Sequence, residues 1–193
     1  MNRLYALLDR ATLERKGWSL EAFADHAEAL GAEVLQYRDK EGGLPRVEEA
    51  LRRLRTRFRG RLLVNDRPEA ARLCDGVHLG QEDFARYGET KEAALEELRR
   101  IVGEGRWIGL STHDEAEILE ANGLELDYIG LGAYRATSTK SDARVLGATK
   151  LPELAALSRH PVAAIGGVRP DDRIPHVRWL VVGSALYDWG DRT

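Results

Sequence analysis

Short apolar runs alternate with amphipathic segments along the whole chain, and no other feature of the sequence restricts the fold as much. Each run has the length of a buried strand, and most of the segments between runs carry apolar residues at the three-to-four-residue spacing of a helix. The runs occupy residues 3–8, 34–37, 62–64, 76–79, 107–110, 126–131, 162–165 and 179–182. The pattern predicts eight strands in a strand–helix alternation.

Eight parallel strands that alternate with helices close most simply into a (β/α)8 barrel, the TIM-barrel fold. An open doubly wound sheet is the alternative, but the first strand–helix turn lacks the glycine fingerprint of a dinucleotide-binding fold. The chain has 193 residues and contains no linker-like or low-complexity stretch. We therefore expect residues 1–193 to form a single α/β barrel domain.

Several predicted helices carry start and stop signals. Ser19 stands as an N-cap before an apolar helical stripe that Gly31 ends, and Pro45 opens the next helix. Thr112 and Glu115 have the spacing of a capping box, which predicts the start of the fifth helix.

The last two strand–helix units are short. Only residues 169–176 are available for a seventh helix, and few residues follow the eighth strand. We expect a shortened seventh helix and a vestigial or absent eighth helix. Apolar strand surface on that side then needs a cover, which we expect from a second copy of the chain in a homo-oligomer or from the tail Tyr187-Asp188-Trp189.

Composition and charge exclude several classes of protein and of partner. Hydrophobic residues make up 43% of the chain and charged residues 32%, which is typical of a globular protein that is neither disordered nor membrane-spanning. A net charge of −3, with basic residues spread along the chain, argues against nucleic acid as the main partner. The first residues lack the features of a secretory signal, so we expect a cytoplasmic location. The single cysteine, Cys74, excludes a disulfide framework and a cysteine-rich zinc site.

Polar residues gather where the predicted strands end, which is where barrels place their reactive groups. At the end of the second strand, the two-residue period puts Gln36, Arg38 and Lys40 on one face. These side chains offer hydrogen-bond donors to an anion. The alternative is a solvated charge cluster in which the cations pair with Asp39 and Glu41.

Two carboxylates follow adjacent strands. Asn65 and Asp66 end the third strand, and Asp83 follows the fourth. Such a pair suits Mg²⁺, which needs one or two carboxylates and completes its shell with water and phosphate oxygens. Taken singly, Asp66 is also a common type of helix cap, and Asp83 is a common turn residue.

The segment after the sixth strand is rich in small, hydroxyl and cationic residues, as in a phosphate-binding loop. Thr137 and Thr139 offer hydroxyl donors, and Lys140 supplies a point charge. An ordinary surface turn has a similar composition.

Small residues after the last two strands predict a second anion-binding pole. Gly167 follows the seventh strand, and Gly183 and Ser184 follow the eighth, where barrels commonly bind phosphate through backbone N–H groups. The alternative is that the Gly-Gly pair only forms an ordinary turn, which is common at strand ends. Together with the donors of the second and third strands, this gives a site with two poles, which suits two phosphorylated ligands.

Ser111 and His113 end the fifth strand. Neighbouring residues at an extended strand end do not face one another, so we do not expect a catalytic serine–histidine pair here. We expect Ser111 to hydrogen-bond a substrate. His113 is either a site residue or part of the helix start.

Six short motifs follow one another at the strand ends: Gln-x-Arg-x-Lys, Asn-Asp, Gly-Val-His-Leu-Gly-Gln-x-Asp, Gly-x-Ser-x-His, Thr-x-Thr-Lys and Ile-Gly-Gly. Their order and spacing closely resemble those of the thiamine phosphate synthase family, from about Leu4 to Leu186. The resemblance implies a barrel fold and a transferase. The implied reaction joins hydroxymethylpyrimidine pyrophosphate to hydroxyethylthiazole phosphate, which gives thiamine phosphate and pyrophosphate.

The resemblance also implies roles for individual residues. Those that would bind the pyrimidine pyrophosphate are Gln36, Arg38, Lys40, Asn65 and Lys140. Those that would bind the thiazole phosphate are Thr137, Thr139, Gly167, Gly183 and Ser184. Asp66 and Asp83 would bind Mg²⁺, and Ser111 would lie near the pyrimidine ring. The implied catalytic groups are Arg38, Lys40, Lys140 and Ser111, with the cations neutralising pyrophosphate as it leaves a pyrimidine-methyl cation.

Two other functions stay open at this point. One is a thiazole tautomerase of the same superfamily, which isomerises a thiazole carboxylate phosphate with a histidine near the end of the fifth strand, where this chain has His113. The other is a non-catalytic protein that binds thiamine precursors. The short C-terminal units and Gly183, which replaces a bulkier aliphatic residue, depart from the synthase pattern at the thiazole phosphate end.

Overall fold

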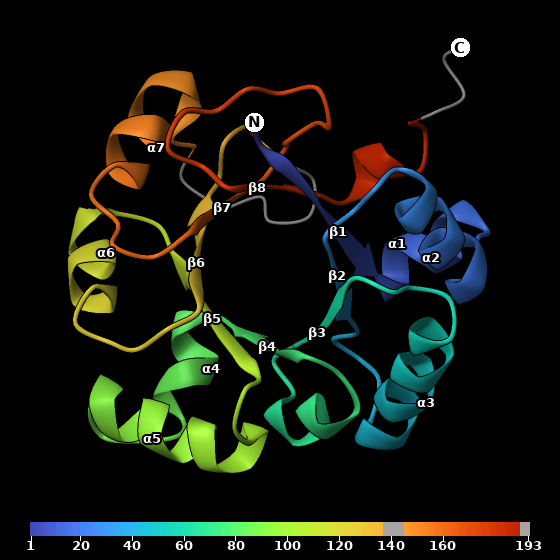
Figure 1. The fold of residues 1–193 in the computed structure, drawn as a ribbon, viewed down its shortest axis with the longest axis horizontal. Helices are drawn as coiled ribbons and strands as arrows, with labels where there is room; N and C mark the ends of the chain where they lie inside the picture. Colours follow the sequence, from blue (N-terminus) through green and yellow to red (C-terminus); the bar gives the residue numbers. More distant parts are fainter. Residues whose placement is uncertain (137–144, 190–193) are drawn as a thin grey trace.

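The computed structural model describes residues 1–136 and 145–189. Eight parallel strands form a closed barrel in which each strand pairs with its neighbours in chain order (Figure 1). They are β1 (Arg3–Asp9), β2 (Val34–Arg38), β3 (Arg61–Asn65), β4 (Gly76–Leu79), β5 (Trp107–Thr112), β6 (Tyr128–Gly132), β7 (Val162–Ile165) and β8 (Trp179–Val182). Pairing of β8 with β1 closes the ring. The predicted (β/α)8 barrel is confirmed.

The helices form an outer ring around the strands (Figure 1). They are α1 (Arg10–Lys16), α2 (Leu20–Ala29), α3 (Leu44–Arg55), the 3₁₀ helix η1 (Pro68–Leu73), α4 (Gln81–Ala85), α5 (Lys91–Val102), α6 (Glu115–Ala121), α7 (Gly147–Ala155) and the 3₁₀ helix η2 (Ser184–Leu186). The short helices α1 and α4 were not expected from the sequence. Every helix among the described residues is too short or too polar to cross a lipid bilayer.

Three local signals behave as predicted. The Ser19 hydroxyl accepts a hydrogen bond from the backbone N–H of Ala22 at 3.0 Å and so caps α2. Gly31, at φ +71°, follows the end of that helix in the left-handed conformation that favours glycine. Pro45 lies in the first turn of α3.

The capping box predicted for Thr112 and Glu115 is wrong. Thr112 is the last residue of β5, where its buried hydroxyl donates to the carbonyl of Gly130 at 2.9 Å. Asp114 caps α6 instead, since its carboxylate accepts from the N–H of Glu117 at 3.0 Å. The barrel register, which places Thr112 opposite Leu131, extends the strand through the predicted cap.

The C-terminal units are shorter than the other units, as expected. Residues 166–178 connect β7 to β8 by turns without a helix, so the seventh helix is lost rather than shortened. Only η2 follows β8 in the described part of the chain. Tyr187 beyond it is buried and packs on Trp18 and Phe23, with ring centroids 5.4 and 5.0 Å away. The tail therefore covers the side next to α1 and α2, as predicted (Figure 1).

The strand residues divide between two apolar layers. Tyr5 and Leu7 of β1 pack inside the barrel, whereas Ala6 and Leu8 join the larger core that includes the helices. The inner layer is aromatic at its base, where the ring centroids of Tyr128 and Trp179 lie 5.9 Å apart. Above this base the barrel interior becomes polar, and the candidate site lies in that polar part.

Candidate active site

A cavity of about 450 Å³ opens at the carboxyl ends of the strands. All eight strands contribute to its lining, which includes seven of the predicted site residues: Gln36, Arg38, Asn65, Ser111, Gly167, Gly183 and Ser184. His113 also lines it. Reactive groups of barrels lie at this end. Most of the residues that were predicted from their positions at strand ends therefore lie around one cavity.

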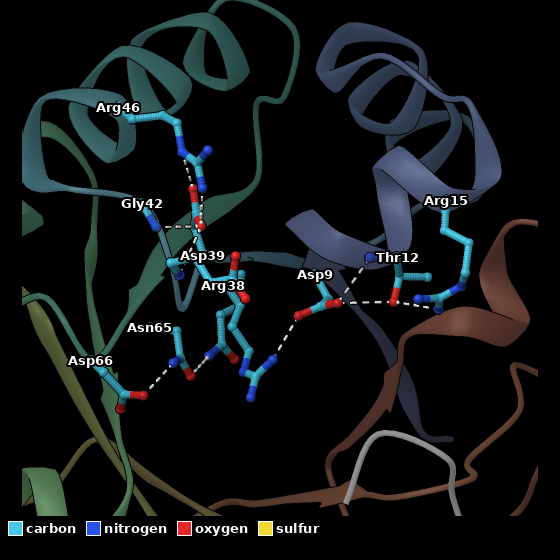
Figure 2. A network of polar contacts seen from close by, with 11 residues as sticks. Asp9, Thr12, Arg15, Arg38, Asp39, Gly42, Arg46, Asn65 and Asp66 are labelled. Carbon is cyan, nitrogen blue, oxygen red and sulfur yellow. Dashed lines mark hydrogen bonds and ion pairs between the residues drawn. The ribbon is translucent and has the colours of Figure 1, made fainter.

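Arg38 is a predicted cation that lines the cavity (Figure 2). Its Nη1 donates to Oδ1 of Asp9 at 2.6 Å, and only 14% of its side chain is exposed. The second oxygen of Asp9 accepts from the backbone N–H and the hydroxyl of Thr12 at 3.0 and 2.9 Å. A guanidinium has five N–H donors. Because Asp9 is its one hydrogen-bond partner among the described residues, donors remain for an anion.

Asp39 and Lys40 do not line the cavity. Asp39 is buried and accepts from both Nε and Nη2 of Arg46, at 2.8 and 2.7 Å, and from the N–H of Gly42 at 2.8 Å. Burial raises the pKa of Asp39, but these hydrogen bonds outweigh it and hold the pKa below its usual value. Lys40 is exposed beyond the end of β2. Gln36 and Arg38, which lie in the strand, therefore share one face as predicted. Lys40, which lies beyond the strand, does not join them.

A chain of hydrogen bonds crosses the barrel interior beneath the cavity. The hydroxyl of Tyr5 donates to Oε1 of Gln36 at 2.7 Å and contacts the hydroxyl of Tyr128 at 2.9 Å. Tyr128 in turn contacts Nδ1 of His78 at 2.8 Å, and Nε2 of His78 contacts Oγ of Ser111 at 2.9 Å. Burial raises the pKa of both tyrosines, so both stay protonated.

The same chain continues to the third strand. Nε2 of Gln36 donates to Oδ1 of Asn65 at 2.7 Å, and Nδ2 of Asn65 donates to Oδ2 of Asp66 at 2.5 Å (Figure 2). Because Tyr5 donates to Gln36, its oxygen accepts from Tyr128, and Tyr128 accepts from N–H at Nδ1 of His78.

These contacts position Ser111. Nε2 of His78 lies 2.9 Å from Oγ of Ser111 and so holds the serine hydroxyl at the cavity. His113 does not pair with Ser111, as expected; its Nδ1 contacts Oε2 of Glu117 at 2.9 Å.

Sequence reasoning missed the interior members of this chain, Tyr5, Tyr128 and His78, as functional residues. His78 stands in the Gly-Val-His-Leu-Gly-Gln motif, and both tyrosines occupy inward positions of their strands. An inward polar group in an otherwise apolar strand was the signal that could have found them.

Asp66 and Asp83 each lie close to Gly80, but neither lines the cavity. Asp66 has a positive φ of 53°, and its Oδ1 accepts from the N–H of Gly80 at 3.2 Å. A Cβ placed on Gly80 would lie 3.6 Å from Oδ2 of Asp83, whose other oxygen pairs with Arg86 at 2.9 Å. No group of three or more histidine, cysteine or acidic residues gathers for a metal within the described ranges. Two carboxylates at one loop fit Mg²⁺, which takes its other ligands from water and phosphate.

The glycine pole is built by a backbone extension of the β6–β7 pair. The N–H groups of Tyr134 and Arg135 donate to the carbonyls of Ile165 and Gly166, each at 2.8 Å. Gly166 and Gly167 have φ values of +89° and +63°, and a Cβ on Gly166 would lie 2.6 Å from that of Ala133. Only glycine combines this conformation with so close an approach.

Arg135 holds the β7–β8 connection that lacks a helix. Its Nη1 and Nη2 donate to the two oxygens of Asp172, each at 2.7 Å, and Nη1 also donates to the carbonyl of Gly167 at 2.9 Å. Asp172 further accepts from the N–H of Arg169 at 2.8 Å. Arg135 and Arg169 line the cavity and add two cations that the sequence reasoning missed. Thr137, Thr139 and Lys140 lie outside the described residues.

Asp172→Asn should lower the free energy of unfolding at pH 7 by about 1 kcal/mol. The hydrogen bonds from Arg135 hold the pKa of Asp172 below its ordinary value of 3.8. A lowered pKa contributes stability above the ordinary value and loses it as the pH falls through the folded value, so the difference between the two proteins should shrink below about pH 4. Urea denaturation at neutral and acid pH measures this. A difference that grows on acidification contradicts it.

Known proteins resemble this chain over most of its length. A family profile described as thiamine monophosphate synthase matches residues 4–183. The thiamine-phosphate synthase of Persephonella marina is 38% identical over 170 residues, which cover 86% of this chain and 76% of that protein. A probable thiamine biosynthetic bifunctional enzyme, chloroplastic, of Oryza sativa subsp. japonica is 32% identical over 96% of this chain, but the chain spans only 34% of it.

A solved structure shares the fold. The thiamine phosphate pyrophosphorylase from Pyrococcus furiosus superposes with a TM-score of 0.74 at 28% identity, over 93% of this chain and 85% of that one.

Proposed function

This chain belongs to the thiamine monophosphate synthase family, and on that premise we propose that it couples hydroxymethylpyrimidine pyrophosphate with hydroxyethylthiazole phosphate. The products are thiamine phosphate and pyrophosphate. The observation that carries the proposal is one cavity lined by Arg38 and Asn65 of β2 and β3 and by Gly167, Gly183 and Ser184 after β7 and β8, which we propose as two anion-binding poles. Two phosphorylated substrates fit that division.

The first pole is proposed to hold the pyrimidine pyrophosphate. Arg38 has N–H donors left for the phosphates, and Gln36 and Asn65 orient one another at 2.7 Å. Lys40 and Lys140 are proposed to add charge from the loops after β2 and β6. Ser111, which His78 holds at 2.9 Å, is proposed to hydrogen-bond the pyrimidine ring.

Asp66 and Asp83 are proposed to hold Mg²⁺ at this pole. Each carboxylate lies close to Gly80, and that of Asp66 also accepts from Asn65. When bound, the ion would neutralise charge on pyrophosphate oxygens. The aspartates would thereby make the leaving group more stable without touching the carbon that reacts.

The second pole is proposed to hold the thiazole phosphate. Backbone N–H groups at Gly167, Gly183 and Ser184 suit a phosphate, and Thr137 and Thr139 are proposed to add hydroxyl donors. Arg135 and Arg169 supply positive charge on the same side of the cavity.

The proposed mechanism is dissociative. The bond between the pyrimidine methylene carbon and the pyrophosphate oxygen breaks, and its electron pair leaves with pyrophosphate. The thiazole nitrogen then donates its lone pair to the pyrimidine-methyl cation. No side chain has to accept a proton, so the cations Arg38, Lys40 and Lys140 act by charge stabilisation, and the second pole acts by holding the thiazole close.

A cytoplasmic location and a homo-oligomer that covers the C-terminal side remain part of the proposal. Tyr187 already covers the face next to α2. A second copy would therefore have to bind elsewhere on that side. Sedimentation velocity of the purified chain tests this, and a single monomeric species would contradict the oligomer.

An assay of pyrophosphate release by the purified chain tests the proposed function. Release should require hydroxymethylpyrimidine pyrophosphate, hydroxyethylthiazole phosphate and Mg²⁺ together. A thiazole tautomerase would isomerise its substrate without releasing pyrophosphate, and a binding protein would retain ligand without turnover. Either result, obtained with protein that binds the pyrimidine substrate, would contradict the synthase proposal.

A further inference from the structure

A second cavity, of about 510 Å³, lies at the opposite end of the barrel, where the strands begin. Arg61 is the first residue of β3, and Arg178 and Trp179 stand at the start of β8. This cavity shares no lining residue with the candidate active site. Whatever it binds is therefore recognised independently of the proposed synthase reaction.

The two carboxylates of this cavity are already neutralised. Oε1 of Glu33 pairs with Arg3 at 2.9 Å, and its Oε2 accepts from Nε1 of Trp179 at 3.0 Å. Oδ2 of Asp75 accepts from Nη1 of Arg55 at 2.7 Å and from the N–H of Leu62 at 2.7 Å. Each acid is therefore already paired with one arginine, and neither pairs with Arg59, Arg61 or Arg178.

Three arginines remain without a carboxylate partner in the described part of the chain: Arg59, Arg61 and Arg178. The guanidinium carbon of Arg61 lies 3.8 Å from the ring centroid of Trp107, and that of Arg178 lies 4.7 Å from the ring centroid of Trp179. The two tryptophan centroids are 5.5 Å apart. Each of these two guanidinium groups thus lies over its own tryptophan ring, and the two rings are neighbours.

Stacking on a ring uses the face of a guanidinium and leaves its N–H edge free. That edge matches phosphate oxygens in a two-bond geometry, which a lysine ammonium cannot reproduce. Three positive charges without carboxylate partners around one cavity favour binding of a multivalent anion over a single carboxylate. The volume lies within the range of about 300–1,000 Å³ that is usual for small-ligand sites.

We propose that this cavity is a binding site for a polyphosphate group. The group comes either from an organic triphosphate or from free inorganic polyphosphate, since both present the same oxygens. Arg59, Arg61 and Arg178 contact those oxygens, while Trp107 and Trp179 hold two of the guanidinium groups in place.

Calorimetric titration of the full chain with inorganic tripolyphosphate and with ATP tests the proposal, at fixed ionic strength and without Mg²⁺. The triple variant Arg59→Gln/Arg61→Gln/Arg178→Gln should raise the Kd for tripolyphosphate about tenfold or more. The matched control, Arg52→Gln/Arg53→Gln/Arg100→Gln, removes the same charge from exposed positions and should leave the Kd unchanged. Pyrophosphate-release activity should be the same in both triple variants.

The titrations also separate the two sources and the two cavities. If ATP binds more tightly than tripolyphosphate, the site is assigned to an organic triphosphate. If the two bind equally, the site recognises the polyphosphate group alone. Equal Kd values for the wild type and both triple variants would overturn the proposal. Binding that is lost in Arg38→Gln and kept in the first triple variant would also overturn it, because the probe would then occupy only the candidate active site. If the triple variant does not fold, Arg178→Gln alone should still raise the Kd.

Discussion

Arg38→Gln should lower kcat/KM for pyrophosphate release about 10²-fold or more, by analogy with removal of one preorganised donor to a developing oxyanion. Asp9 holds this guanidinium at 2.6 Å in the cavity wall, so its remaining donors are in place before substrate binds. Glutamine keeps polarity but removes the charge that would stabilise departing pyrophosphate. Steady-state assays with both substrates measure the loss.

Matched substitutions locate the effect in the cavity. Arg53→Gln removes the same charge from the outer face of α3, where Arg53 pairs with Glu21 and is 47% exposed, and should leave turnover unchanged. Arg38→Lys keeps the charge without the planar fork and should recover only part of the rate. If Arg38→Gln turns over as fast as Arg53→Gln, Arg38 does not stabilise the leaving group.

Gly109→Ala should lower the free energy of unfolding by about 3 kcal/mol, through overpacking and through loss of buried hydrogen bonds. A Cβ on Gly109 would lie 2.2 Å from Cζ and 2.6 Å from the hydroxyl oxygen of Tyr128. The ring is fully buried, so it has to move and carry its hydroxyl away from His78 and Tyr5. His78, which holds Ser111, then loses its contact with Tyr128, and kcat/KM should fall with stability.

Gly123→Ala is the matched control. Gly123 is exposed after α6, and a Cβ there has its nearest neighbour at 3.4 Å. Its free energy of unfolding should change by less than about 0.5 kcal/mol. Urea denaturation of both variants makes the comparison, and equal stability would mean that Tyr128 has room to accommodate the methyl group.

Much of the architecture followed from local pattern. Strands buried on both faces read as short apolar runs, so the eight strands and their order were predictable. Ser19 and Pro45 act within one turn of their helices, which is why their roles were also predictable. The capping box predicted at Thr112 is wrong because this residue pairs with β6 as part of β5. Sequence spacing alone does not show that a residue is needed by the strand rather than by the helix cap.

The candidate site divides in the same way. Gln36, Arg38 and Asn65 could be placed at the cavity because strand ends in a parallel barrel meet at one edge. Lys40 could not, because the period of two ends with β2 and the chain turns at Asp39, which Arg46 and Gly42 hold outside the cavity.

The sequence by itself determined the barrel, the chemistry available at each strand end and the family that those motifs resemble. The tertiary structure alone decided the partners: Arg38 with Asp9, and Ser111 with His78 rather than the neighbouring His113. The reason is that periodicity along one strand states which face a side chain occupies but not what stands opposite. Tyr5 and Tyr128 are 123 positions apart in the chain, and only closure of the barrel brings their hydroxyls to 2.9 Å.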